Sequence, residues 1–353
     1  MPTKTVLDWI IDANTCFLIG AGCSKCAGKP LIGELTEEVR KALSRPAKAI
    51  LEDLRGTYGR SATVEDLINH LLQLHKLLSS RKSQEHEDWT PKSIEQEIAT
   101  IQRAIVDAIG TEWAGSDIHK KFLLRLTDQR ARKTCDIFCL NYDTVIEASL
   151  EELRLPYTDG FRGAENAYFD PSLYGQIPGN GPYFRVFKLH GSINWIRDAD
   201  ETVRRRPATA VEDRRRAVVY PAEQKYVQTQ YGVYETLLSL FRDRLREDRP
   251  NNKLVVIGYS FSDEHINLAI EDSILADGSN LTIYGFVGPE ENKEEQEKRL
   301  REMAARCDDR FNVFIGQHAY ISSAIEPDEW ETIKELDLWK FENLVNLMVG
   351  GGQ

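Results

Sequence analysis

The chain has 353 residues, of which 41% are hydrophobic and 29% charged, and its formal net charge is −11 at pH 7. This composition is typical of a globular protein with a sizeable core, the charge argues against broad binding to nucleic acid, and no apolar stretch approaches the roughly 20 residues that span a membrane. Six cysteines do not indicate a disulfide framework and the first 15 residues lack a signal-peptide layout, so we expect a reducing, cytoplasmic location.

Short apolar runs, each followed by polar or glycine residues, recur along the sequence and predict strands. They are apolar throughout rather than alternating, which is typical of strands that are covered on both faces. The runs cover residues 16–19, 135–140, 185–189, 254–257, 281–286 and 312–315. Because helical patterns separate several of them, the sequence predicts an α/β fold with a doubly wound, mostly parallel, Rossmann-like sheet.

About 110 residues between the first two predicted strands have the spacing of amphipathic helices. The predicted helices cover residues 64–78, 94–110 and 117–128. In the first of them, four leucines share one face: Leu67, Leu71, Leu74 and Leu78. This block is far longer than a normal connection between a strand and a helix, so we expect a helical insertion at about 34–132.

The end of the sequence has amphipathic helical patterns on both sides of the last predicted strand. We therefore expect one large domain over residues 1–330 and a C-terminal helical segment over 331–353. Between the third and fourth strands, arginines 204–206 and 214–216 form two triplets. Nearby acidic residues dilute this positive charge and favour a solvated loop, and a contact with phosphate or an acidic partner surface is the alternative.

The first predicted strand runs directly into Gly20-Ala21-Gly22-Cys23-Ser24. Small residues in such a loop let the backbone approach a pyrophosphate, which backbone N–H groups then bind. The third glycine of a full G-x-G-x-x-G is missing, and so is the G-K-[ST] of a Walker loop. A tight turn with a purely structural role is the alternative.

The same loop contains a C-x-x-C pair, Cys23 and Cys26. A tetrahedral zinc site needs four ligands, and the sequence has no second pair with metal-ligand spacing. A redox role would require an exposed Cys23 with a lowered pKa. We therefore interpret this loop by its glycines and expect no metal site.

Polar residues follow the next two predicted strands. Asn141 and Asp143 follow the second, where Asn141 is suited to orient a water or a ribose hydroxyl. Asp143 is suited to accept hydrogen bonds from a ribose, or simply to cap the next helix. His190 follows the third strand and is suited to act as a general base, next to Gly191, which leaves room for a ligand.

The fourth strand ends at Gly258, and Ser260 leads into a helix that is predicted to begin near Asp263. Gly258 and Ser260 are suited to line the second half of a dinucleotide. The carboxyl ends of parallel strands meet at one edge of a sheet, where open α/β sheets bind ligands. We therefore expect these four strand ends to form one site.

These motifs follow one another in a fixed order from about Thr15 to Asn267: GAG-x-S, Asn-x-Asp, K-L-H-G-S-x-N-W and G-Y-S-F-S-D. The combination resembles the sirtuin-like domains of bacterial antiphage defence systems. The resemblance implies a sirtuin fold that binds NAD+, with Asn141 and His190 as catalytic residues. It also implies the residues that bind NAD+: Gly20, Ala21, Gly22, Ser24, Asn141, Asp143, His190, Gly191, Gly258 and Ser260.

Two features of protein-deacetylating sirtuins are missing. No cysteine lies between His190 and Cys307, so we expect neither the zinc module nor zinc, and Gly28-Lys29-Pro30-Leu31 replaces the D-F-R segment. The resemblance therefore implies an NAD+ glycohydrolase that depletes cellular NAD+ in abortive infection. The alternatives are a protein deacylase or ADP-ribosyltransferase, and a catalytically silent subunit that binds NAD or ADP-ribose.

The length of the chain is similar to that of the sirtuin subunits that assemble with a HerA-like hexameric DNA-translocating ATPase. We therefore expect a homo-oligomer, with such an ATPase as a partner. The helical insertion and the amphipathic C-terminus are the candidate assembly surfaces.

Overall fold

All six predicted strands form, within two residues of the expected bounds. They are β1 (Thr15–Ile19), β2 (Thr134–Cys139), β6 (Tyr183–Lys188), β10 (Lys253–Ile257), β11 (Thr282–Val287) and β12 (Phe311–Ile315). The computed structural model describes residues 6–7, 10–58, 61–81, 88–110, 112, 114–128, 133–179, 182–198, 202–206, 217–219, 232–290, 292–307, 310–322 and 325–350.

These strands share one sheet with two short ones, β3 (Tyr157–Thr158) and β13 (Ala319–Ile321). The strand order is β13-β12-β11-β10-β1-β2-β6-β3. Every pair is parallel except β12 with β13, which is antiparallel. The order reverses between β1 and β10, because β2 and β6 follow β1 on one side while β11 and β12 follow β10 on the other. In open α/β sheets, ligands bind at such a reversal.

Helices cover both faces of this sheet, as predicted for a doubly wound fold. In β1, Cys16 and Leu18 face one apolar core while Phe17 and Ile19 face the other. The first core is closed by α10 (Val233–Leu245), α11 (Glu264–Leu275) and α12 (Lys293–Arg306). The second is closed by α7 (Asp117–Thr127), α8 (Val145–Glu152), α13 (Pro327–Lys334) and α14 (Phe341–Met348).

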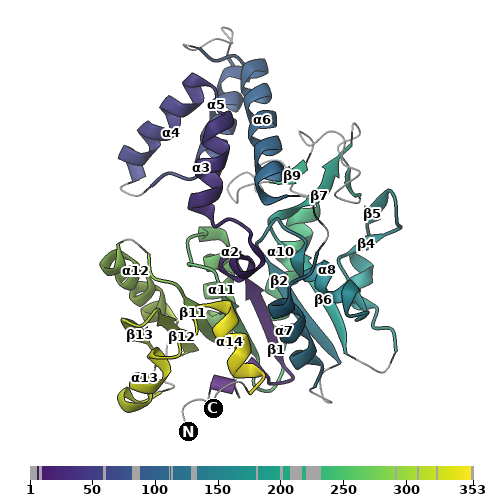
Figure 1. The fold of residues 1–353 in the computed structure, drawn as a ribbon, viewed down its shortest axis with the longest axis vertical. Coiled ribbons are helices and arrows are strands. Elements are labelled where there is room, and N and C mark those ends of the chain that lie inside the picture. Colours follow the sequence, from purple (N-terminus) through teal and green to yellow (C-terminus); the bar gives the residue numbers. More distant parts are fainter. Residues whose placement is uncertain are drawn as a thin grey trace.

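The predicted helical insertion forms beyond the carboxyl end of β1 (Figure 1). Its helices are α3 (Ile32–Ala42), α4 (Arg45–Tyr58), α5 (Val64–Ser79) and α6 (Pro91–Ile109). They bury a core of their own. Helix α7 packs on the sheet instead, so the expected block at 34–132 has two parts. The division of the chain at residue 330 stays a prediction.

Local signals set the ends of the long insertion helices. Thr63 and Asp66 form a capping box at the start of α5, in which the Thr63 hydroxyl accepts a hydrogen bond from the Asp66 N–H at 3.3 Å. Thr90 caps α6, where Pro91 occupies the first helical position and Gly110 follows the last one. In the part of the chain that the structure describes, no helix has both the length and the apolarity to cross a membrane.

A second, five-stranded sheet lies beside the main one, and its pairs are antiparallel. Its strands are β4 (Phe161–Arg162), β5 (Ala167–Phe169), β8 (Val203–Arg205), β7 (Gly191–Arg197) and β9 (Ala217–Val219). Short 3-10 helices follow α2 and β5, at η1 (Lys25–Ala27) and η2 (Pro171–Gly175). Its strand β7 begins directly after His190, so the second sheet continues the loop that carries this residue.

The first arginine triplet corrects the expectation of a solvated loop. Arg204 and Arg205 lie in β8, and Arg205 Nη1 is 2.9 Å from the buried carboxylate Oδ2 of Asp159. Arg204 and Arg206 lie 3.6 and 3.7 Å from the carboxylate of Asp198. Acidic groups of the same chain therefore neutralise these arginines. Arginines 214–216 lie outside the described residues.

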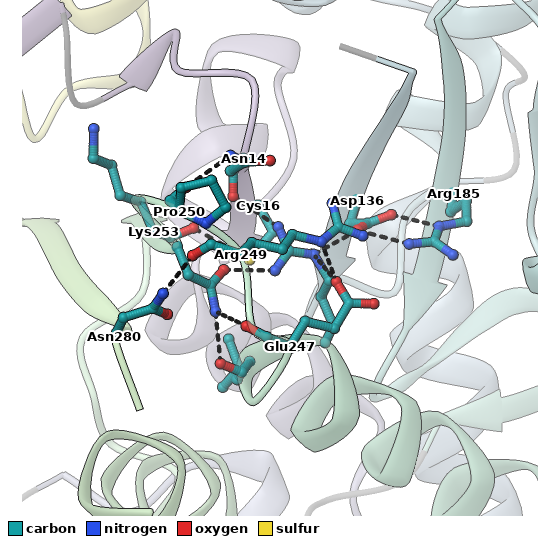
Figure 2. Close-up of polar contacts among 12 residues, drawn as sticks. Asn14, Cys16, Asp136, Arg185, Glu247, Arg249, Pro250, Lys253 and Asn280 are labelled. Carbon is teal, nitrogen blue, oxygen red and sulfur yellow. Dashed lines mark hydrogen bonds and ion pairs between the residues drawn. The ribbon is translucent and has the colours of Figure 1, made fainter. Parts of the chain in front are cut away.

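A buried ionic network stabilises the amino edge of the main sheet (Figure 2). Asp136 of β2 is 2% exposed and lies 2.5 Å from Arg185 Nε and 2.8 Å from Arg244 Nε. Arg244 of α10 also donates to Asn252 Oδ1 and to the Asn14 carbonyl, both at 2.7 Å. Burial alone raises the pKa of the Asp136 carboxyl, but the two guanidinium groups outweigh it and hold this pKa below its usual range.

We expect Asp136→Asn to lower the free energy of unfolding by about 3–5 kcal/mol near neutral pH, because two buried guanidinium groups lose their counter-charge. Because the folded-state pKa of Asp136 is lowered, its contribution is present above the unfolded pKa, about 3.9, and is lost as the pH falls through the folded value. Urea unfolding at several pH values tests this. The control Glu38→Gln, in an exposed pair with Lys41, should leave stability nearly unchanged. An equal effect of both variants at pH 7 would contradict the prediction.

Candidate active site

The loops that follow β1 and β10 contact each other directly at the reversal of the sheet. The Gly20 N–H donates to the Ile257 carbonyl and the Gly22 N–H to the Gly258 carbonyl, both at 2.9 Å. A Cβ added at Gly22 would lie 2.7 Å from Gly258 Cα, and one added at Gly258 would lie 2.5 Å from Cys23 N. Gly258 also has a left-handed φ of 66°. Glycine is therefore required at these positions because the two backbones approach too closely to leave room for a side chain.

Asn141 attaches the loop after β2 to this contact. Its side-chain nitrogen Nδ2 donates to the Gly20 carbonyl at 3.0 Å and to the Ser24 hydroxyl at 2.7 Å. Ser24 ends the short helix α2 (Ala21–Ser24). The side-chain oxygen Oδ1 of Asn141 is buried and has no hydrogen-bond partner among the described residues. Since such an acceptor is costly to leave unsatisfied, it marks a place for a ligand that donates hydrogen bonds.

The segment from Lys188 to Ile193 holds the backbone of Tyr142 and Asp143, the two residues that follow Asn141. The Ile193 N–H and the Ser192 hydroxyl donate to the Tyr142 carbonyl at 2.9 and 3.2 Å. The ammonium group of Lys188, which is fully buried, donates to the Asp143 carbonyl. Burial opposes a charge on Lys188, but the neighbouring Cys139, Glu147 and Asp143 groups hold its pKa above the usual value.

Asp143 has the structural role that the sequence left open. Its carboxylate oxygen Oδ1 accepts a hydrogen bond from the Val145 N–H at 3.0 Å, at the first turn of α8. The side chain is buried. Asp143 therefore satisfies a helix N-terminus beside the candidate site.

Tyr142 connects the helical insertion to the site. Its hydroxyl donates to Glu65 Oε1 of α5 at 2.7 Å. Tyr142 and Ile193 also belong to the apolar core of the insertion. The residue between Asn141 and Asp143 is therefore anchored in the insertion, and sequence reasoning did not single it out.

His190 lies in the tight connection between β6 and β7. Gly191 has a left-handed φ of 84°, so the turn itself favours glycine at this position. The His190 imidazole is buried, and its Nε2 atom lies 3.0 Å from Asp263 Oδ2. Sequence reasoning noted Asp263 only as the start of a helix, which is correct, because Asp263 is the N-cap of α11.

Apart from Asp143 and Gly191, whose roles in the backbone are described above, the predicted site residues fall into three groups. Gly20, Gly22, Ser24, Asn141 and Gly258 are joined by contacts. His190 reaches the loop after β10 through Asp263. The Ser260 hydroxyl bonds to Ser262 within its own loop, at 3.1 Å, and Ala21 is partly exposed beside Gly20. The structure thus brings strand ends β1, β2 and β10 together, and His190 after β6 joins them through its contact with Asp263.

The two cysteines of the C-x-x-C do not have the properties of a redox pair. Cys23 is fully buried and its Sγ lies 3.3 Å from the Ile257 carbonyl. Burial raises the pKa of Cys23 well above its usual range and that of Cys26 to about 11. A redox role for Cys23 is therefore wrong on both requirements. Over the described residues, no group of three or more histidine, cysteine or acidic side chains has the arrangement of a metal site.

The fold and this site define a Rossmann-like α/β protein that places polar groups at the switch point of its sheet. Residues 136–307 match the family model of the SIR2-like domain. The match covers just under half of the chain, from β2 to the end of α12. No curated protein matches the chain. The chain therefore carries a sirtuin-like domain, which is consistent with an enzyme that uses NAD+.

The matched region includes Asn141, His190 and Gly258, whereas the loop from Gly20 to Ser24 lies outside it. The hydrogen bonds from Asn141 to Gly20 and Ser24 join the two parts. The structure therefore assigns this N-terminal loop to the same site.

We expect Gly258→Ala to destabilise the protein by about 2 kcal/mol or more, because its Cβ would meet backbone atoms that cannot move aside and its φ is left-handed. Chemical denaturation measures this. Gly28→Ala is the matched control, since Gly28 has a φ of 75° but nothing within 4 Å of an added Cβ. It should show the backbone strain alone, about 1 kcal/mol. Equal losses in both variants would show that the contact between the loops is not tight.

Proposed function

We propose that this protein is an NAD+ glycohydrolase that cleaves NAD+ to nicotinamide and ADP-ribose. The observation that carries the proposal is the Asn141 side chain. Its nitrogen is committed to Gly20 and Ser24, and its buried oxygen has no partner among the described residues. A ribose hydroxyl or an attacking water is a donor that would satisfy this oxygen. The location at the switch point of the sheet fits a dinucleotide.

The proposed reaction needs little chemical help beyond positioning. The bond between C1′ of the ribose and the pyridinium nitrogen breaks, and its electron pair leaves with nicotinamide as a neutral molecule. The oxygen of a water forms the new bond to C1′, and its proton passes to the His190 imidazole. In this scheme Asn141 orients the ribose or the water, and Gly20 to Ser24 bind the diphosphate. Holding the two reactants in place supplies much of the rate.

Hydrolysis is favoured over protein deacylation by two features of the chain. The sequence between His190 and Cys307 contains no cysteine for a zinc module, and the chain builds strands β7, β8 and β9 there instead. At the D-F-R position the chain has Gly28 to Leu31, where the Lys29 ammonium donates to the Ile109 carbonyl at the end of α6. This loop therefore connects the site to the insertion.

The proposed biological setting is antiphage defence in the cytoplasm, where depletion of NAD+ stops an infected cell. An enzyme that destroys a central cofactor must be restrained until infection. We propose a homo-oligomer and a HerA-like ATPase partner for this purpose, on the basis of the resemblance of the sequence motifs. Comparing NAD+ consumption by the chain alone and by the chain co-expressed with its genomic neighbour tests the partner.

We expect Asn141→Ala and His190→Ala each to reduce NAD+ hydrolysis by about 100-fold or more, because each removes a group that positions or deprotonates the reactants. Chromatography of nicotinamide and ADP-ribose measures the rate, and circular dichroism shows that both variants fold. The control His75→Ala removes an imidazole on α5 that pairs with Glu95, outside the site, and should keep the wild-type rate. Wild-type turnover by Asn141→Ala would refute the assignment.

The products distinguish the alternatives. Hydrolysis yields free ADP-ribose and nicotinamide in equal amounts. A modified acceptor protein would establish a transferase or deacylase instead. NAD+ that stabilises the protein against heat but stays intact, also with the co-expressed neighbour, would establish a silent binding subunit.

A further inference from the structure

Asp263 contacts His190 across the candidate site. The two atoms Asp263 Oδ2 and His190 Nε2 are 3.0 Å apart, and the side chains are 9% and 8% exposed. His190 follows β6 and Asp263 follows β10, and β1 and β2 lie between these strands. The contact therefore passes over the ends of two strands, where Gly20 and Asn141 lie.

The Asp263 carboxylate is held in one orientation. Its Oδ1 atom accepts hydrogen bonds from the His265 and Ile266 N–H groups at 2.9 and 3.2 Å, which caps α11. The Asp263 N–H donates to the Tyr259 hydroxyl at 3.0 Å. Capping the helix uses Oδ1 alone, as a neutral serine or asparagine also does. The orientation of Oδ2 toward the imidazole is thus not explained by the cap.

The loop that carries Asp263 contains a backbone conformation that costs free energy. Gly258 and Phe261 have left-handed φ values of 66° and 55°, and such a conformation costs a bulky residue like phenylalanine free energy. Phe261 is held there because its ring is buried in the apolar core. The position of Asp263 is therefore set by packing.

Other titratable groups surround this pair. From the neighbouring elements they are Glu65 of α5, Tyr142 and Asp143 after β2, Tyr259 after β10, and Arg299 of α12. Burial raises the pKa of both tyrosines well above the usual range, so they are neutral. Glu65 is hydrogen-bonded to Tyr142 and Arg299 is paired with Glu290. Asp263 is the acidic group in direct contact with the imidazole.

The distance between His190 Nε2 and Asp263 Oδ2 is that of an ion pair. Within the described residues, however, Nε2 of His190 makes no aligned hydrogen bond. Hydrogen bonds between catalytic groups are often poorly aligned in an unliganded enzyme and tighten when the substrate binds. An aligned contact leaves the proton on Nε2 and makes Nδ1 the acceptor.

We propose that Asp263 is a positioning residue for His190, which keeps the imidazole proton on Nε2 and stabilises the imidazolium after His190 accepts a proton. This inference rests on the proposed NAD+ hydrolysis, in which the proton of the attacking water passes to His190. In this scheme Asp263 acts through His190 and not on the substrate itself. The sequence motifs indicated His190 alone as the general base, and Asp263 adds a carboxylate that orients it.

Asp263→Asn tests this, because asparagine still caps α11 but has no charge. We expect kcat for NAD+ to fall about 10- to 100-fold with KM within about twofold, because the carboxylate stabilises the imidazolium that forms as the water is deprotonated. Asp263→Ser, which also retains a cap, should behave alike and serves if Asp263→Asn does not fold.

Asn292→Ala is the matched control, since Asn292 caps α12 and its loss should lower only the melting temperature. An unchanged kcat in Asp263→Asn, or a KM that rises as much as kcat falls, would overturn the proposal. Nitrogen NMR chemical shifts of the His190 imidazole report which ring nitrogen carries the proton, and in the unliganded protein they separate this inference from the proposed function. A loss of the form protonated on Nε2 in Asp263→Asn supports the pair even if the wild type hydrolyses no NAD+, and unchanged chemical shifts overturn it.

Discussion

At the reversal of the main sheet, the loops after β1 and β10 meet backbone to backbone, and the Gly22 N–H donates to the Gly258 carbonyl at 2.9 Å. A side chain at either position would collide with the other loop. This close approach fixes where Gly20 presents its carbonyl and where α2 begins. Asn141 binds both that carbonyl and Ser24, so the third loop of the site takes its position from the contact between the first two.

Asn141 also explains how the site is left ready for a ligand. One end of its amide is used by the protein, and the other end is buried without a partner among the described residues. An amide cannot reverse these roles, because only its nitrogen can donate to Gly20. The neighbouring Tyr142 is fastened to α5 through Glu65, so a displacement of the insertion would reach Asn141 through one residue.

The amino and carboxyl ends of the strands in the main sheet have different roles. At the amino edge, Asp136 and two arginines form a fully partnered network that ties β2 and β6 to α10. At the carboxyl edge, the polar groups are only partly satisfied, and the backbone at Phe261 is left-handed. Strain and unsatisfied acceptors are tolerated at a functional site when the rest of the fold supplies the stability.

The strands and the helical insertion could be predicted from the sequence, because a strand buried on both faces must be apolar throughout and a helix on a core repeats its leucines. The expectation that the four strand ends with motifs lie near one another followed from the parallel sheet, because its strands end on the same side. Tertiary structure alone decided that Arg205 pairs with Asp159, 46 residues away, and that Asp263 faces His190. From the sequence alone, Asp263 could be predicted only as a helix cap. Its second carboxylate oxygen contacts His190, and folding brings these two residues together from strands that are separated by β1 and β2.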